Sequence, residues 1–190
     1  MKRKITLMAV LLMAALYTNG QAVELGTNVL SAGIGLGGRF GGFTYGSQTP
    51  GISLHFERMM WEAGDVGFIS LGGYAGVKSY KYTAAYYSSY SYSQKWSYTI
   101  LGVRSAFHYT GLESDNFDLY GGLMLSYNIL NYKYEDNDPY PDSYVTASYG
   151  SAVGITAYAG GRYFFNQKIG ALAEVGYGVS YLTIGLAYKF

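Results

Sequence analysis

The sequence of 190 residues contains no cysteine and only two histidines. Without cysteine the chain has no disulfide bond, no thiolate metal site and no cysteine nucleophile. It also lacks the residue through which bacterial surface proteins receive a lipid anchor. Two histidines provide few ligands for zinc, which usually takes about three from the protein. We therefore expect no metal site and no cysteine-dependent activity.

Charge is also scarce. Charged residues make up 13% of the chain, whereas a soluble domain usually carries about 25%. After the N-terminal segment no run of about 18 apolar residues occurs, so we expect no transmembrane helix. Glycine, with 27 residues, and tyrosine, with 23, are abundant instead. This combination is typical of a membrane β-barrel, which needs an apolar outer band, aromatic rims and closely packed strands.

The N-terminal segment has the form of a secretory signal peptide. A basic start, Lys2 to Lys4, precedes an apolar run from Ile5 to Leu16. Small residues follow at the positions of a cleavage site, so we predict cleavage after Ala22, with Gly20 as the alternative. A buried helix is the competing interpretation. The predicted organisation is therefore a signal peptide at 1–22 and one barrel domain at 23–190.

Loss of the signal peptide would remove three of the 13 basic residues and none of the 12 acidic ones. The remaining chain is slightly acidic and shows no strongly basic patch. Proteins that bind nucleic acid usually show such a patch, so we expect no nucleic-acid partner.

The rest of the sequence alternates between apolar and polar residues with period two, which indicates strands. We predict eight, each long enough to cross a bilayer when tilted, at 28–37, 51–60, 66–80, 95–109, 117–132, 150–165, 169–178 and 181–190. Short turns alternate with longer connections at 38–50, 79–94 and 133–149. The predicted fold is all-β, an eight-stranded antiparallel up-and-down transmembrane barrel with periplasmic turns and termini.

The polar face of these strands consists mostly of Gly, Ser, Thr and Tyr. A solvated exterior usually carries roughly a quarter to a third charged residues, so this face suits the narrow lumen of an eight-stranded barrel. Its charged or titratable members are Glu57, Arg104, Asp118, Arg162 and Glu174, with His55 and His108.

Within that set we predict a lumenal charge network of Glu57, Arg104, Arg162 and Glu174. Because buried charges must be paired, we interpret the network as a structural plug. A selective path through the lumen is the alternative.

The last ten residues, YLTIGLAYKF, alternate strictly. The positions in phase with the end of the chain are all apolar or aromatic: Leu182, Ile184, Leu186, Tyr188 and Phe190. This terminal strand resembles the signal that the outer-membrane assembly machinery recognises.

Three further segments support a family resemblance: ILGVRSAFHY (100–109), YGGLMLSYNI (120–129) and AEVGYGVSYLTIGLAYKF (173–190). With the terminal strand, they resemble the small outer-membrane β-barrels that include the OmpA N-terminal domain, OmpX and OmpW, in a form common in Bacteroidetes. The resemblance covers essentially all of 23–190. It implies location in the cell outer membrane, with membrane lipid and the assembly machinery as partners. A resemblance at the level of fold does not determine function.

Two other features of the sequence could suggest a different function. Gly33 to Gly38 matches a dinucleotide-binding fingerprint by letter, but no helical pattern follows it, so we expect no cofactor. Glycines there more simply ease the close approach of strands. With only two histidines, the chain offers few candidates for the histidine of a catalytic triad, so we expect no enzymatic activity.

The connection at 79–94, SYKYTAAYYSSYSYSQ, contains Tyr82, Tyr86, Tyr87, Tyr90 and Tyr92. It fits a hairpin rising through the aromatic girdle, and also an adhesive surface, because Tyr and Ser make adaptable contacts. The expected function is a filled barrel whose loops contact an extracellular ligand or host surface, or support the envelope. The alternatives are a narrow channel for small or hydrophobic molecules and an enzyme that modifies lipid A.

Overall fold

The computed structural model describes residues 21–38, 45–86, 90–112, 114–136 and 150–190. The predicted signal peptide at 1–22 therefore lies outside the described residues except for its last two. Within the described ranges, no helix is long and apolar enough to span a membrane.

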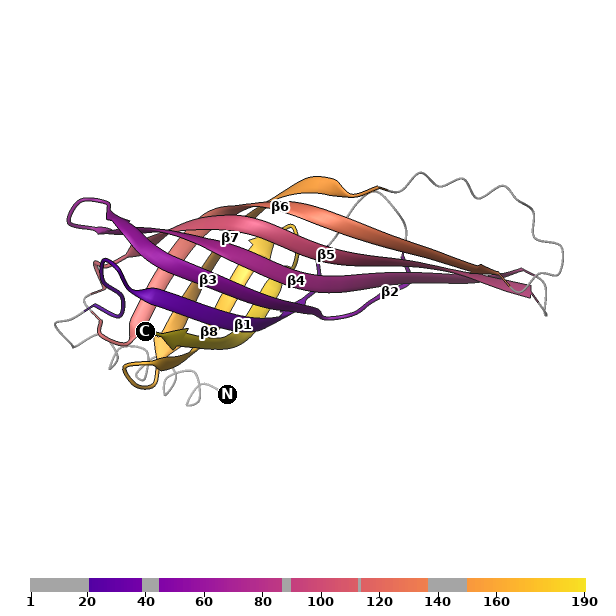
Figure 1. Cartoon of the computed structure of the whole chain (residues 1–190). Coiled ribbons are helices and arrows are strands. Elements are labelled where there is room, and N and C mark those ends of the chain that lie inside the picture. The colour runs from indigo at the N-terminus through magenta and orange to yellow at the C-terminus, as the bar shows by residue number, and fades with distance from the viewer. Residues whose placement is uncertain (1–20, 39–44, 87–89, 113, 137–149) are drawn as a thin grey trace, which may run out of the picture.

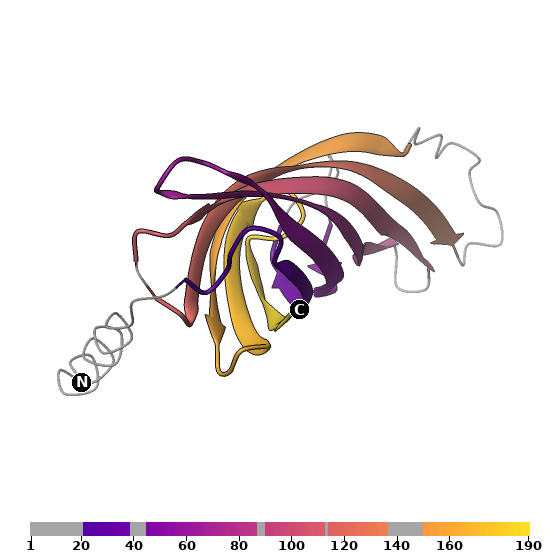
Figure 2. The same cartoon turned by 60° about the vertical axis from the view of Figure 1, so that its left-hand side comes forward.

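The described chain forms one antiparallel sheet that closes on itself (Figures 1 and 2). From β3 to β9 consecutive strands pair, and β1 pairs with both β3 and β9, so eight strands close into the barrel. The short strand β2 pairs only with β4. The strands are β1 (Asn28–Leu36), β2 (Ser47–Gln48), β3 (Gly51–Glu62), β4 (Gly67–Tyr86), β5 (Tyr90–Tyr109), β6 (Phe117–Asp136), β7 (Ala152–Phe164), β8 (Ile169–Tyr177) and β9 (Leu182–Lys189). The predicted eight-stranded barrel is confirmed.

The alternating apolar and polar residues of the sequence lie on opposite faces of the barrel wall. In β3, Gly51 to Met60 alternate strictly between buried and exposed positions, with Ser53, His55 and Glu57 buried in the lumen. The outward positions are large and apolar: Ile155, for example, is 71% exposed and Leu186 is 62% exposed. A continuous apolar exterior of this kind requires lipid around it, because water would not solvate it.

In a closed barrel, the backbone N–H and C=O groups form hydrogen bonds between neighbouring strands. A β-protein can cross a bilayer only in this form, because the hydrocarbon core offers no water as an alternative partner. Short turns at 63–66, 110–116 and 165–168 lie at the same end as Phe190, while β4, β5 and β6 extend at the other end (Figure 1). Short periplasmic turns and long extracellular segments characterise outer-membrane barrels. The protein is therefore an outer-membrane β-barrel, with both ends of the described chain at the periplasmic side.

The predicted bounds of the connection at 79–94 were wrong, whereas the hairpin that this segment was also expected to form is confirmed. β4 and β5 are each 20 residues long and stay paired from Gly67↔Tyr109 to Tyr86↔Tyr90, so only 87–89 connect them. β6 likewise continues to Asp136 rather than ending at 132. Alternating Tyr, Thr and Ser favour strand structure, and each extended strand supplies the backbone partner of the next. The three strands therefore continue well past the rest of the barrel (Figure 1).

Candidate functional site

The four residues of the predicted charge network meet in the lumen. Arg104 on β5 donates from Nε to Glu57 Oε1 at 2.9 Å and from Nη2 to Glu174 Oε2 at 2.8 Å. Arg162 on β7 donates to the other oxygen of Glu57. Glu57 on β3 thus joins two arginines from strands on either side of the lumen. Both arginines and Glu57 are essentially inaccessible to solvent.

Glycines in the lumen make these contacts sterically feasible. Gly72 on β4 lies directly between Glu57 on β3 and Arg104 on β5 in the strand register. Because position 72 has no side chain, Arg104 reaches Glu57 across the intervening strand. Gly160 on β7 lies in the same way between Tyr120 and Glu174, whose side chains form a hydrogen bond of 3.2 Å from the tyrosine hydroxyl.

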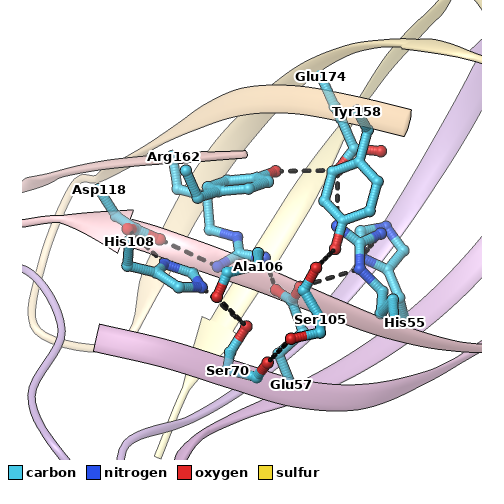
Figure 3. A network of polar contacts seen from close by, with 12 residues as sticks. His55, Glu57, Ser70, Ser105, Ala106, His108, Asp118, Tyr158, Arg162 and Glu174 are labelled. Atoms are coloured by element: carbon cyan, nitrogen blue, oxygen red, sulfur yellow. Dashed lines mark hydrogen bonds and ion pairs between the residues drawn. The ribbon is translucent and has the colours of Figure 1, made fainter. Parts of the chain in front are cut away.

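The network extends beyond the four predicted residues. Arg162 Nη1 donates to Asp118 Oδ2 at 3.0 Å, and the other Asp118 oxygen lies 2.8 Å from His108 Nδ1. His108 Nε2 in turn lies 3.0 Å from Ser70 Oγ. Figure 3 shows Ser70, His108, Asp118 and Arg162 in sequence, with Glu57 beside them. Sequence reasoning placed Asp118 and His108 on the inward face but did not join them, and it missed Ser70.

Ser70, His108 and Asp118 lie in the order of a hydrolytic triad, but their surroundings do not suit one. Ser70 and His108 have no exposed surface, and Asp118 is 2% exposed. One Asp118 oxygen is bound by Arg162, and Ser70 Oγ lies 3.4 Å from the Ala106 carbonyl oxygen, to which it donates. A nucleophile must be reachable by its substrate, and this hydroxyl is not. The arrangement links β4, β5 and β6 inside the barrel.

An aromatic ring lies against each of the two arginines. The Arg104 guanidinium lies 4.0 Å from the centre of the Tyr158 ring, and the Arg162 guanidinium lies 4.3 Å from that of Tyr120. Such stacking is favourable for a desolvated cation. The Tyr158 hydroxyl donates to the carbonyl of Ser105 at 3.1 Å. Each guanidinium therefore contacts two carboxylates and one aromatic ring, which leave it little freedom to move.

A second set of contacts lies on the extracellular side of the network. Lys78 on β4 is buried and donates to the carbonyl oxygens of Gly37 and Val179, the latter at 3.0 Å. Val179 belongs to the short connection between β8 and β9 and is 6% exposed. Gly38 has a φ of 104°, and a side chain there would meet the Val179 carbonyl. Lys78 thus joins Gly37, which follows β1, to the connection between β8 and β9.

Between the network and these contacts remains a cavity of about 20 Å³, bordered by His55, Tyr74, Arg104 and Glu174 among others. A single water molecule needs about 10–15 Å³ of this kind of space. The described lumen is therefore filled by side chains at this level, with room for little more than one water.

The residues of the predicted assembly signal all point outward on β9 or directly after it. Phe190 and Asn28 exchange two backbone hydrogen bonds of 3.0 Å, which join the end of the chain to the start of β1. The Phe190 ring lies 5.7 Å from that of Tyr188 and 6.5 Å from that of Phe56. Leu182, Ile184 and Leu186 continue this exposed apolar row along the strand.

Of the five predicted surface tyrosines, the structure describes the side chains of Tyr82 and Tyr92. Their rings lie 6.0 Å apart, and Tyr92 lies 6.0 Å from Tyr134. All three share the strand parity of the lumenal residues and are half-buried, so they line the inner face of the extended strands rather than the lipid side. Tyr86 and Tyr90 pair at the ends of β4 and β5, and Tyr87 lies outside the described residues.

No family model matches the chain, and no curated protein matches it. Among solved structures, a de novo designed transmembrane β-barrel is similar at 15% identity and a TM-score of 0.46, covering 88% of this chain and 98% of the other. Ail, the attachment invasion locus protein of Yersinia pestis, solved with the heparin analogue sucrose octasulfate, is similar at 12% identity and a TM-score of 0.45, covering 88% and 100%.

The translocator domain of the autotransporter NalP from Neisseria meningitidis is similar at 15% identity and a TM-score of 0.34, covering 98% of this chain and 96% of the other. With TM-scores below 0.5, these likenesses assign no ligand or activity to the chain.

Proposed function

We propose that this protein is a plugged outer-membrane barrel that presents an extended three-stranded surface outside the cell. That surface would contact an extracellular ligand or host surface, or support the envelope. The observation that carries the proposal is the continuous ion-pair network across the lumen, from Glu174 through Arg104, Glu57 and Arg162 to Asp118. We group the protein with the small barrels that include OmpA, OmpX and OmpW, on its eight strands and the segments quoted above.

The plug is supported by the burial and pairing of the lumenal charges. A conduction path would need water-accessible polar groups along the barrel axis, whereas Glu57, Arg104 and Arg162 are at most 1% exposed. Breaking one buried ion pair costs about 3–5 kcal/mol, because the charge that stays in the lumen is left without its partner. Thermal opening of the lumen would therefore be rare.

The first prediction concerns conductance. The purified protein in planar bilayers is expected to give no steady open state above the bare membrane, because side chains fill the lumen at the level of the network. The variant Lys78→Ala removes the upper contacts to Gly37 and Val179 and leaves the network intact, so it is expected to remain silent as well. Insertion is verified in the same preparation by the mobility shift of unboiled protein on gels. A steady open state of the wild type would contradict the plug and favour the narrow-channel alternative.

We also propose that the barrel is not an enzyme. The buried and fully engaged hydroxyl of Ser70 supports this, because no substrate atom could approach it without displacing lumenal side chains. The same burial argues against a role in modifying lipid A, whose reacting groups lie outside the lumen.

The second prediction concerns assembly. We propose that Phe190 acts in recognition by the assembly machinery, in line with its place at the end of the outward row of β9. Phe190→Ala keeps the two backbone hydrogen bonds to Asn28 but removes the ring, and we expect a several-fold lower yield of folded protein in outer-membrane fractions. Phe165→Ala is the matched control, since Phe165 is an equally exposed aromatic at the same end of the barrel. Equal yields from both variants would show that the ring contributes only to the aromatic girdle.

A further inference from the structure

Three lysines face one another on the outer surface of the extended strands. In the strand register Lys81 on β4 lies directly opposite Lys95 on β5, and Lys95 lies directly opposite Lys133 on β6. All three side chains are exposed. Residues directly opposite in an antiparallel pair have Cβ atoms about 4.5–5.5 Å apart. The lysines therefore form one continuous row across three strands, which we call the lysine row.

Such a row is unfavourable by itself, because like charges directly opposite each other destabilise a sheet. Lys133 is partly compensated by Glu135, whose Oε1 lies 3.2 Å from its Nζ. Neither Lys81 nor Lys95 has a carboxylate of any described residue within ion-pair distance. An anion bound between the ammonium groups would remove this repulsion.

The height of the lysine row indicates where that anion comes from. The last outward row with large apolar residues is Val77, Thr99 and Ile129, and the next is Ser79, Ser97 and Asn131. The lysine row follows two residues further on. At about 3.3 Å per residue and a strand tilt of about 35–45°, it lies about 9–11 Å beyond the row of Val77 and Ile129. The polar headgroup layer of a bilayer is about 5–8 Å deep on each side, and the long lysine side chains reach back to it from this row.

The surface at the lysine row is hollowed. A cavity of about 410 Å³ is bordered by the three lysines, by Glu135, which pairs with Lys133, and by hydroxyl residues that include Ser47, Thr49 and Ser93. The short strand β2 forms one side of it, since Ser47 pairs with Lys81. A single phosphate would leave most of this volume empty, whereas a phosphorylated headgroup fits the range of ligand sites.

We propose that the lysine row binds the phosphate group of an anionic lipid in the leaflet that surrounds the barrel. A lipid whose chains lie against Val77 and Ile129 places its headgroup at Lys81, Lys95 and Lys133. Hydroxyl donors beside the ammonium groups suit phosphate oxygens. The site lies outside the lumen, so it goes beyond the proposed function and does not depend on the plug.

The test is native mass spectrometry of the full folded protein in micelles, titrated with diphosphorylated lipid A or with phosphatidylcholine. We expect the wild type to prefer the diphosphorylated lipid. Lys81→Gln with Lys95→Gln is expected to weaken that binding about thirtyfold, since each lysine at an anionic surface contributes about fivefold. Glu135→Gln is expected to tighten it, because Lys133 is then free to bind the phosphate.

The matched control is Arg58→Gln with Lys168→Gln, which removes two exposed cations at the periplasmic end. This control is expected to bind the lipid like the wild type. If it loses as much lipid affinity as the Lys81→Gln and Lys95→Gln variant, the effect is one of net charge alone and the proposed site is wrong. Displacement of the lipid by equimolar inorganic phosphate would assign the cavity to a free anion instead.

A second measurement covers folding. Without lipid, the Lys81→Gln and Lys95→Gln variant should unfold at the same or higher denaturant concentration than the wild type, because repulsion is relieved. Loss of stability would show that the lysines are structural and would contradict the proposal.

Discussion

Replacing Arg162 by methionine is expected to lower the free energy of unfolding of the barrel by about 3–5 kcal/mol. Arg162 is fully buried and is bound by Glu57 on one side and Asp118 on the other. Methionine fills much of the same space but leaves both carboxylates without this partner in the lumen. Breaking a buried pair is costly because the remaining charge loses its compensation and does not regain water.

The measurement is reversible urea unfolding in phospholipid vesicles, followed by tryptophan fluorescence. Trp96 is buried in the barrel and Trp61 is half-exposed on its surface, so unfolding changes the surroundings of both. Arg58→Met is the control, since Arg58 is exposed near the periplasmic interface, where such changes alter stability by about 0–1 kcal/mol. A loss below about 1 kcal/mol for Arg162→Met would mean that the network does not stabilise the barrel.

A double variant separates pairing from packing. Glu57→Gln combined with Arg162→Met removes one charge of each sign, and Arg104 keeps its contact with Glu174. The two changes are therefore expected to cost less together than the sum of their separate effects, by about 0.5–3 kcal/mol. Strict additivity would indicate that Glu57 and Arg162 do not act as a pair.

Gly72→Ala is expected to destabilise the barrel by about 1–3 kcal/mol, although it adds only one methyl group. That methyl would overlap the carbonyl oxygen of Phe56 and lie 2.8 Å from the Cα of Glu57. Both obstacles are backbone atoms of the paired strand, so β3 would have to move. The methyl would also separate Glu57 from Arg104, which lie on either side of Gly72 in the register.

The adjacent position gives a matched control. Gly73 points outward, and the nearest atom to a methyl there would be the Gly102 carbonyl oxygen at 4.0 Å. Gly73→Ala is therefore expected to leave stability unchanged or to raise it by up to about 1 kcal/mol, by restricting the unfolded chain. The same vesicle unfolding measurement compares the two variants. Similar values for both would refute the close approach at Gly72.

Strand parity explains how much of the site could be predicted. In a strand, alternate residues face opposite sides, so placing Glu57 and Arg104 on the polar face follows from the local sequence once a barrel is assumed. The terminal alternation of β9 is likewise visible in ten residues. The bounds predicted for the connection at 79–94 were wrong for a related reason. Residues such as Tyr, Ser and Thr occur both in turns and in strands. Here the two halves of the segment pair with each other, because the end of β4 lies beside the start of β5.

Contacts between residues of neighbouring strands could not be predicted in the same way. His108, Asp118 and Ser70 lie on three strands, and their contact depends on the register of β4 with β5 and of β5 with β6. The lysine row has the same origin, since Lys81, Lys95 and Lys133 are far apart in sequence and meet only through these registers.

The sequence alone therefore determined the class of the protein: an exported all-β chain with an apolar outer face, a polar inner face and a terminal aromatic strand. These properties depend on composition and on a period of two, which are local. The tertiary structure alone decided which lumenal charges pair, that Asp118 and Ser70 join them, that the lumen is filled at the level of Arg104, and that three lysines share one row. Each of these depends on strand register, which is set by closure of the whole barrel.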